Sequence, residues 1–192
     1  MNPIILASGS PRRRQLLEML GIPFRVVQPD VDETYPAGEA PEAYVVRLAR
    51  AKAAAVAGRE PGALVLGADT TVEVRGQVLG KPSSPDEAVA MLKKLQGRTH
   101  HVLTAVALAK DGRIEHALDV SDVTFRPLDN ATIEDYVATG EPMDKAGAYA
   151  VQGKGAVMVD WIRGDFFGVM GLPIRLVIEL LDRFEVTYRF TR

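Results

Sequence analysis

The sequence predicts an α/β fold in which a mixed sheet is flanked by helices, and three observations lead to this prediction. Short apolar runs bounded by glycine, proline or serine, such as 4–7 and 63–66, predict buried strands. Segments with apolar residues at helical spacing lie between these runs. Several strand candidates are separated by only two turn residues, which indicates hairpins, so antiparallel pairs must join any parallel ones in the sheet.

The predicted elements follow one another closely along the chain. Ser10 is a candidate N-cap before Pro11, and Gly21 ends the first helix. Arg75-Gly76 and Asp111-Gly112 are expected to form hairpin turns. Helices are predicted at 12–20, 39–58, 85–95, 131–138 and 172–184. Strands are predicted at 4–7, 24–27, 63–66, 71–74, 77–79, 99–109, 114–125, 148–151, 156–162 and 186–190.

Length and composition indicate an ordinary globular protein. The 192 residues suit a single domain, residues 1–192, with two lobes around a cleft and a sizeable core. The hydrophobic fraction is 47% and the charged fraction 25%, which excludes the disordered class.

Charge and cysteine content exclude several function classes. A net charge of −2 argues against general nucleic-acid binding, although a local positive pocket can still take a small anion. The absence of cysteine excludes disulfides, cysteine zinc sites and a cysteine nucleophile. The first apolar run is too short for a signal peptide, and no stretch has the length of a membrane-spanning helix. We therefore expect a cytoplasmic protein that binds neither membrane nor nucleic acid.

A basic strand-to-helix junction is the first candidate site. It reads Ser8-Gly9-Ser10-Pro11-Arg12-Arg13-Arg14. Free N–H groups and the helix dipole favour an anion at a helix start, and hydroxyl and guanidinium groups suit phosphate oxygens. The alternative is that Ser10 only caps the helix and the arginines are solvated. Because consecutive helical positions fan out, we do not expect all three arginines to face one ligand.

Carboxylates supply the second group of candidates. Asp69 follows a buried strand and could bind a divalent metal or act as a general base, or it could merely form an Asx turn. Asp32 and Glu33 lie in a turn-rich segment and could hold a hard cation. Lys52 lies on the apolar side of an alanine-rich helix, where a charge requires a functional reason unless the side chain extends its amine to solvent.

Two later segments could complete a nucleotide site. In Gly80-Lys81-Pro82, Lys81 could place a charge on a phosphate, but the spacing excludes a P-loop. In the small-residue segment 144–153, Gln152 offers the donor and acceptor needed to read a base edge. His100 and His101 are adjacent in a strand and point to opposite faces, so they make a poor metal pair.

The motifs in their order resemble the Maf family over nearly the whole chain. They are Leu6-Ala7-Ser8-Gly9-Ser10-Pro11-Arg12-Arg13, Tyr44-Val45-Val46-Arg47-Leu48-Ala49-Arg50-Ala51-Lys52, Gly67-Ala68-Asp69-Thr70, Gly80-Lys81-Pro82, Gly140-Glu141-Pro142-Met143-Asp144-Lys145-Ala146-Gly147-Ala148-Tyr149 and Val169-Met170-Gly171-Leu172-Pro173. No single motif is decisive, but together they are specific. Asp165-Phe166-Phe167 departs from the Ser-Tyr pair that is common at this place in the family.

The resemblance implies an elongated α/β fold with a deep central cleft, similar to inosine triphosphatases. It implies hydrolysis of a nucleoside triphosphate to the monophosphate and pyrophosphate with a divalent cation, magnesium or manganese. Asp69 would activate water; Ser8, Arg13, Glu33, Lys52 and Lys81 would line the phosphate and metal region, with Glu33 and Asp69 as metal ligands. The pattern at 144–153 is similar to the branch that prefers dTTP and UTP, where Arg12, Thr70 and Gln152 would contribute to substrate choice.

Two other classes stay open at this point. One is a nucleotide sensor without catalysis that regulates cell division, which would bind nucleotide with no metal-dependent turnover. The other is a nucleotidyltransferase, which would need an acceptor before it released pyrophosphate. The family was first linked to septum formation, but no residue here implies that role. The resemblance also suggests a homodimer.

Overall fold

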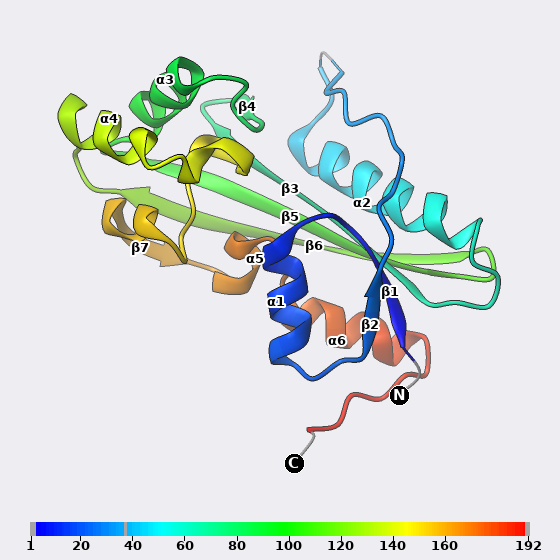
Figure 1. Ribbon diagram of the computed structural model, residues 1–192. Helices are drawn as coiled ribbons and strands as arrows, with labels where there is room; N and C mark the ends of the chain where they lie inside the picture. Colours follow the sequence, from blue (N-terminus) through cyan, green and yellow to red (C-terminus); the bar gives the residue numbers. More distant parts are fainter. Residues whose placement is uncertain (1–2, 37, 191–192) are drawn as a thin grey trace. The chain divides into compact units, whose positions relative to one another are not determined.

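The computed structural model describes residues 3–36 and 38–190, and within them it is a mixed α/β protein (Figure 1). The strands are β1 (Ile4–Ala7), β2 (Phe24–Val26), β3 (Val65–Val74), β4 (Gln77–Leu79), β5 (Thr99–Lys110), β6 (Arg113–Phe125) and β7 (Val159–Arg163). The helices are α1 (Pro11–Met19), α2 (Pro41–Ala57), α3 (Pro85–Leu95), α4 (Asn130–Ala138), α5 (Phe166–Met170) and α6 (Ile174–Arg183). Three short 3₁₀ helices are η1 (Glu141–Asp144), η2 (Ala146–Ala148) and η3 (Lys154–Met158).

One mixed sheet contains all the strands of the described chain, which confirms the predicted fold class. The strand order is β2-β1-β3-β5-β6-β7, and β4 pairs with β3. Strand β1 runs parallel to both β2 and β3, whereas β4 and β7 are antiparallel to their neighbours. Both predicted hairpin turns are present: Arg75-Gly76 and Asp111-Gly112 have positive φ at both residues, as two-residue hairpins favour.

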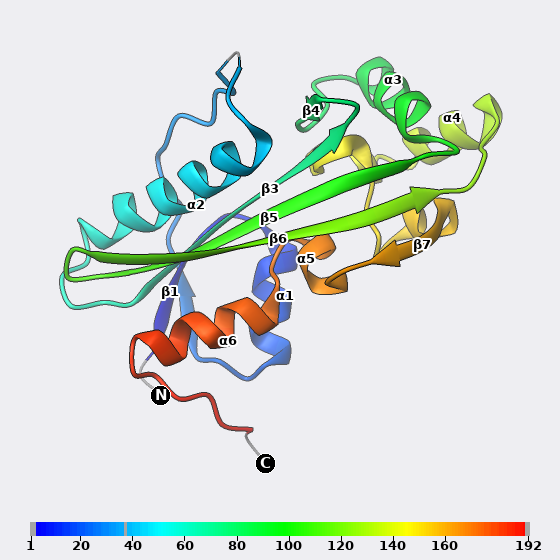
Figure 2. The same cartoon turned by 180° about the vertical axis from the view of Figure 1, so that it is seen from behind.

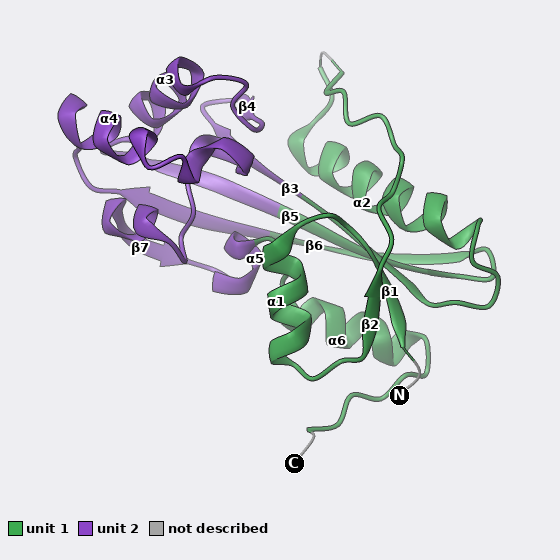
Figure 3. Ribbon diagram, in the orientation of Figure 1, with its two compact units in different colours: residues 1–69, 104–119, 171–192 green, residues 70–103, 120–170 purple. Residues whose placement is uncertain are grey.

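The chain divides into two compact units, coloured separately in Figure 3. Unit 1 contains residues 1–69, 104–119 and 171–192, and unit 2 contains residues 70–103 and 120–170. The predicted domain, 1–192, extends to termini that lie outside the described residues. No helix in the described parts of the chain is both long and apolar enough to cross a membrane.

In unit 1, α2 packs closely on the first half of β3, and Figure 2 shows the two running alongside each other. Gly67 makes this approach possible, since a Cβ there would lie 2.4 Å from the carbonyl oxygen of Ala49 and 2.7 Å from the nitrogen of Ala53. The buried face of α2 is apolar except at Lys52. The close packing places that lysine directly over the strand that contains Asp69.

Unit 2 is built around one hydrophobic cluster. Helices α3 and α4 lie side by side (Figure 2). They contribute Leu92, Leu95 and Ile133 to this cluster. The N-cap of α3 is Ser84, whose hydroxyl accepts a hydrogen bond from the backbone N–H of Glu87 at 3.2 Å, and the helix has the predicted bounds. His100 and His101 differ as the strand pattern predicts, because His100 is buried and His101 is exposed.

Two predicted strands of unit 2 were wrong in whole or in part. Residues 148–151 are buried, but they contain the end of η2, an irregular stretch and the start of a turn instead of the predicted strand. The reason is Gly147, which adopts a φ of +68° and redirects the chain beside Val72. The predicted strand at 156–162 begins only at residue 159, because η3 occupies its first part.

The end of the chain also differs from expectation. Residues 186–190 form no strand; instead the hydroxyl of Tyr188 donates to the carbonyl of Leu20 at 3.0 Å. Helix α5 was not predicted. It begins at the unusual Asp165-Phe166-Phe167, where the Asp165 carboxylate accepts from the backbone N–H groups of Phe167 and Gly168 at 2.8 and 3.0 Å. The departure from the family pattern is therefore a helix cap.

Candidate active site

The junction between β1 and α1 holds one arginine firmly in unit 1. Ser8 is buried, and its hydroxyl accepts from the backbone N–H of Ser10 at 3.2 Å and from Arg13 Nη1 at 3.1 Å. Arg13 is also buried and donates from Nε to the carbonyl of Gly171 at 2.8 Å. Gly171 belongs to the last sequence motif, so this bond brings the first and last motifs into contact.

The three arginines of the junction have different surroundings, as expected for consecutive residues of a helix, which point in different directions. Arg12 is half-buried, Arg13 is buried and Arg14 is exposed. Ser10 occupies the N-cap position of α1, but its side chain makes no capping hydrogen bond. The alternative in which this serine serves only as a cap is therefore wrong.

Lys52 joins two carboxylates at the centre of the site. Its Nζ donates to Asp69 Oδ1 at 2.7 Å and lies 2.6 Å from Glu33 Oε1. The lysine is only 6% exposed and Asp69 only 7%. A snorkelling lysine would reach solvent, so that alternative is wrong. The ammonium of Lys52 is instead held by two carboxylates, of which Asp69 is buried and Glu33 is partly exposed.

Asp69 lies in the middle of β3, not after its end as the sequence suggested. The predicted turn failed because β3 continues without a break from Val65 to Val74, passing under α2. The Asx-turn alternative for Asp69 is therefore wrong as well. A carboxylate on a rigid central strand is positioned more exactly than one on a loop, as a reacting group requires.

Burial dominates the electrostatics of the site. It raises the pKa of Asp69, and the positive charges of Lys52 and Arg13 only partly oppose this effect. The same cause lowers the pKa of Arg13, against the opposing influence of Asp69 and Glu33. A carboxylate whose pKa is raised accepts a proton more readily than an ordinary aspartate does, which suits a general base.

The donor set of the site fits a hard cation only in part. No group of three or more His, Asp or Glu side chains arranged for a metal occurs within residues 3–36 and 38–190. Glu33 and Asp69 nevertheless converge on one cation, the ammonium of Lys52. One or two carboxylates completed by substrate phosphate oxygens and water is a common donor set for magnesium. The residues therefore fit an ion that arrives with its substrate.

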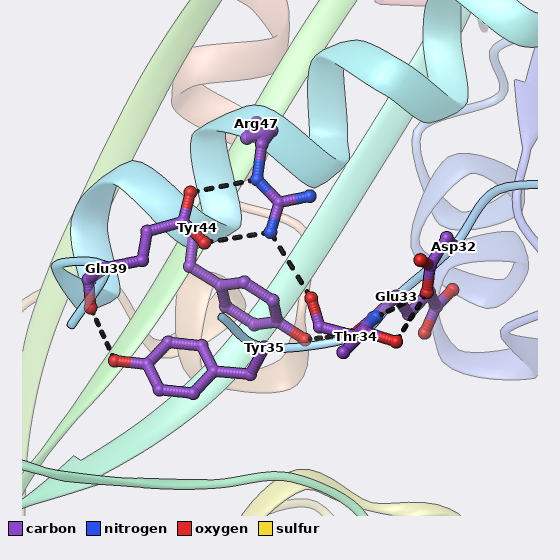
Figure 4. A network of polar contacts seen from close by, with 7 residues as sticks. All are labelled: Asp32, Glu33, Thr34, Tyr35, Glu39, Tyr44 and Arg47. Carbon is purple, nitrogen blue, oxygen red and sulfur yellow. Dashed lines mark hydrogen bonds and ion pairs between the residues drawn. The ribbon is translucent and has the colours of Figure 1, made fainter. Parts of the chain in front are cut away.

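Glu33 lies on an irregular segment that is bound to α2, as Figure 4 shows. The hydroxyl of Tyr44 donates to the carbonyl of Glu33 at 2.8 Å. Asp32 does not join the carboxylate pair, because its side chain accepts from the N–H and hydroxyl of Thr34 at 2.9 and 2.6 Å. This turn lowers the pKa of Asp32 through its hydrogen bonds with Thr34. Of the two acids predicted at this segment, only Glu33 reaches the site.

The three remaining predicted residues belong to unit 2. Thr70 is half-buried on β3, while Lys81 and Gln152 are exposed. Within this unit the Lys81 motif and the small-residue segment meet, because the N–H of Gly147 donates to the carbonyl of Gly80 at 3.1 Å. This bond joins the loop that carries Lys81 to the segment that carries Gln152.

Glu141 holds the turn that carries Gln152, a role that the sequence analysis missed. Its carboxylate accepts from the hydroxyl of Tyr136 at 2.9 Å and from the N–H groups of Lys154 and Gly155 at 3.0 Å each. The hydroxyl of Tyr136 in turn accepts from the N–H of Ala150 at 3.2 Å.

The glycines of this turn leave no room for a side chain. A Cβ on Gly153 would lie 2.5–2.6 Å from the carboxylate of Glu141. A Cβ on Gly155 would lie 2.7 Å from the carbonyl of Ala150. These two glycines were the available sequence signal, because glycine permits a close approach that a side chain would block. We call residues 150–155, with Tyr136 and Glu141, the glutamate-held turn.

Paired buried charges beside a strand-to-helix anion site define the chemistry that unit 1 can support. Arg13 and the α1 start suit phosphate, and Asp69 suits proton transfer, so the site is of the kind found in hydrolases of phosphate anhydrides. The family model described as Maf-like protein matches residues 3–184. The chain therefore belongs to the Maf family.

Relatives with known names cover almost the full length. A dTTP/UTP pyrophosphatase of Myxococcus xanthus is 55% identical, over 94% of this chain and 91% of its own length. Proteins of the same name from Aromatoleum aromaticum and Halalkalibacterium halodurans are 49% and 45% identical, covering 94% and 99% of this chain and 95% and 100% of their own lengths. Among solved structures, the Staphylococcus aureus Ham1 protein has a TM-score of 0.51 at 16% identity, with 96% of this chain and 98% of that chain covered. That likeness confirms the fold.

Proposed function

We propose that this protein is a nucleoside triphosphate pyrophosphatase that hydrolyses dTTP and UTP to the monophosphate and pyrophosphate. The observation that carries the proposal is the buried Asp69, paired with Lys52 and close enough to Arg13 for their charges to affect each other. The names of relatives at 45–55% identity over nearly the whole chain support the choice of substrate.

In the proposed mechanism, Asp69 accepts a proton from a water molecule. The water oxygen attacks the α-phosphorus, the bond to the bridging oxygen breaks, and pyrophosphate leaves. Ser8, Arg12 and Arg13 bind phosphate oxygens at the start of α1, where the helix dipole also favours an anion. Lys52 keeps Asp69 ionised and adds positive charge beside the reacting oxygens, so the protein contributes chiefly position and electrostatics.

A divalent cation, magnesium or manganese, completes the proposal. Glu33 and Asp69 would hold it, and when bound it would neutralise charge on the phosphate oxygens. Unit 2 contributes to substrate binding through Lys81, for a phosphate, and through Thr70 and Gln152, for the base. We also propose that the protein acts in the cytoplasm and binds no nucleic acid, since it has no cysteine and a net charge of −2. The homodimer stays a prediction that sedimentation tests.

The test is pyrophosphate release from dTTP, UTP, CTP, GTP and 7-methyl-GTP, with magnesium, with manganese and with chelator. We expect metal-dependent turnover led by dTTP and UTP without any acceptor molecule. Turnover led by 7-methyl-GTP would keep the mechanism and overturn the assigned base preference. Nucleotide binding without turnover would indicate a sensor, and turnover only with an acceptor would indicate a nucleotidyltransferase.

A further inference from the structure

The segment between β2 and α2 carries Glu33 without regular structure of its own. In the described part of residues 27–40, no helix or strand is present. Each residue of an irregular segment loses conformational entropy when it is ordered, so contacts outside the segment must hold it in place. The side chain of Glu33 is 49% exposed, so burial alone does not fix it.

Two side chains of α2 hold this segment by its main chain. Tyr44 donates its hydroxyl hydrogen bond to the carbonyl of Glu33 at 2.8 Å, and Arg47 donates from Nη2 to the carbonyl of Thr34 at 3.4 Å. Figure 4 shows both bonds reaching successive residues of the segment from one face of the helix. Because the acceptors are carbonyl groups, these bonds fix the backbone from which the Glu33 side chain extends.

The two anchoring side chains are themselves fixed. Arg47 forms a bidentate ion pair with Glu39, and both nitrogen–oxygen distances are 2.8 Å. Its guanidinium carbon lies 5.5 Å from the centre of the Tyr44 ring. The ring of Tyr35 meets the Tyr44 ring edge-on at 4.9 Å, and its hydroxyl donates to the carbonyl of Glu39. The anchors thus contact the segment at residues 33–35 and at Glu39, close to the start of α2.

Helix α2 therefore supplies two different partners to Glu33. Tyr44, near the start of the helix, donates a hydrogen bond to the main chain of Glu33. Lys52, further along the helix, forms an ion pair with the Glu33 carboxylate at 2.6 Å. Lys52 is also the partner of Asp69. A shift of the Glu33 backbone away from α2 would separate its carboxylate from this pair while leaving Lys52 and Asp69 together.

We propose that Tyr44 and Arg47 are positioning residues for Glu33 in the pyrophosphatase site. Their action on the Glu33 carboxylate passes through the backbone of residues 33 and 34, to which both side chains donate hydrogen bonds. This inference rests on the proposed function, since it assigns residues to the reaction named there. It assigns a chemical purpose to the first and fourth residues of the motif Tyr44-Val45-Val46-Arg47, which the sequence left unexplained.

The decisive experiment is a double-mutant cycle between Tyr44→Phe and Glu33→Gln, measured as kcat and KM for dTTP with magnesium. Tyr44→Phe keeps the ring and removes only the hydroxyl. We expect it to lower kcat by about 3–10-fold with KM changed less than about 2-fold, as for the loss of one bond that orients a reacting group. In the Glu33→Gln background its effect should fall below about 1.5-fold, because coupled residues are not additive.

A second measurement reads position without activity. Hydrogen exchange of peptides that cover residues 32–36 should be faster in Tyr44→Phe and in Arg47→Met. Arg50→Met is the matched control on the same helix, since Arg50 contacts His116 at 3.2 Å and not this segment. The control should keep both kcat and the exchange of residues 32–36 at wild-type values.

The outcomes separate the inference from the proposed function. A wild-type protein that releases no pyrophosphate from any triphosphate would refute the function and the inference together. Turnover by the wild type, with Tyr44→Phe and Glu33→Gln effects that multiply independently, would refute the inference alone. So would unchanged exchange at residues 32–36, or a Glu33→Gln variant with wild-type kcat, because then there is nothing for Tyr44 to position.

Discussion

Asp69 in unit 1 and Glu141 in unit 2 are both acids that lie within the folded chain, but their partners differ in kind. Asp69 is paired with charged side chains, Lys52 and, at longer range, Arg13. Glu141 is held by two backbone N–H groups and a tyrosine hydroxyl. Burial raises the pKa of Asp69 despite its partners, whereas the hydrogen bonds of Glu141 outweigh its desolvation and lower its pKa.

This difference shows how one fold can use a carboxylate for two purposes. Fixed backbone dipoles stabilise the ionised form of Glu141 permanently, so it serves as structure. The partners of Asp69 leave its proton affinity above that of an ordinary aspartate, so it can take up a proton during a reaction. In the proposed mechanism unit 1 supplies the reacting carboxylate, whereas the glutamate-held turn of unit 2 fixes the backbone that carries Gln152.

The largest effect is expected for Asp69→Asn. Removing the general base should lower kcat for dTTP by about 10²–10⁴-fold, while nucleotide binding is largely kept. Asp86→Asn, an exposed position on α3, is the control and should keep wild-type kcat. Steady-state kinetics together with equilibrium binding of dTTP measure both quantities. If Asp69→Asn turned over at a near-normal rate, the assignment of Asp69 as general base would be wrong, and the two carboxylates would not differ in function.

Lys52→Met tests whether the charges of unit 1 depend on one another. It leaves Asp69 buried without its ammonium partner, so we expect a loss of about 3–5 kcal/mol in the free energy of unfolding, as for other broken buried pairs. The double variant Lys52→Met/Asp69→Asn removes the uncompensated charge and should recover part of that loss. Urea unfolding of the three variants gives these values. A double variant as unstable as the sum of the single ones would show that the pair does not act as a unit.

Local patterns were sufficient to predict most of the fold. Strand β1, helix α3 and both hairpin turns follow from apolar runs, a serine N-cap and glycine, all of which act within a few residues. The prediction of a strand at 148–151 failed although the segment is apolar and buried. There the N–H of Ala150 bonds to the hydroxyl of Tyr136 instead of a neighbouring strand. A side-chain partner that distant in sequence leaves no trace in the local pattern.

The site was predictable in its residue types but not in its connections. Serine, arginine and carboxylates near predicted element ends suggested phosphate and metal chemistry. The contact between Lys52 and Asp69 depends on Gly67, which lets α2 approach β3, and the sequence does not reveal which helix packs on which strand. The roles of Tyr44 and Glu141 were missed for a similar reason, since both act on main-chain groups whose positions only the fold determines.

His100→Gln tests the other kind of buried group, one that stays neutral. His100 lies in unit 2 with its Nε2 2.9 Å from the Tyr149 hydroxyl, and burial lowers its pKa to about 3. In the unfolded chain the histidine ring is protonated below about pH 6.5, whereas the buried ring of the folded state stays neutral. The free energy of unfolding therefore falls as the pH is lowered below about 6.5, by about 1.4 kcal/mol per pH unit.

The expected result is a weaker dependence of unfolding free energy on pH. Between about pH 6.5 and 4.5, the slope for His100→Gln should be shallower than for the wild type by about 1 kcal/mol per pH unit. Identical slopes for His100→Gln and the wild type would mean that the buried ring is protonated in the folded state.

The smallest effect is expected for Glu141→Gln, which tests the structural carboxylate. An amide keeps one oxygen acceptor but places an NH₂ group against a backbone N–H of Lys154 or Gly155, so one donor loses its partner. We expect a loss of about 0.5–1.5 kcal/mol in the free energy of unfolding, the net contribution of one hydrogen bond, because Lys154 is exposed and water can partly replace the lost acceptor. Because the pKa of Glu141 is lowered, its contribution is present above the pKa of the unfolded side chain and is lost as pH falls through the folded value. The difference between wild type and variant should therefore be full at pH 7 and shrink in acid, whereas kcat should change far less than in Asp69→Asn. A variant that lost turnover as completely as Asp69→Asn, with stability intact, would show that Glu141 takes part in the reaction instead of only holding the turn.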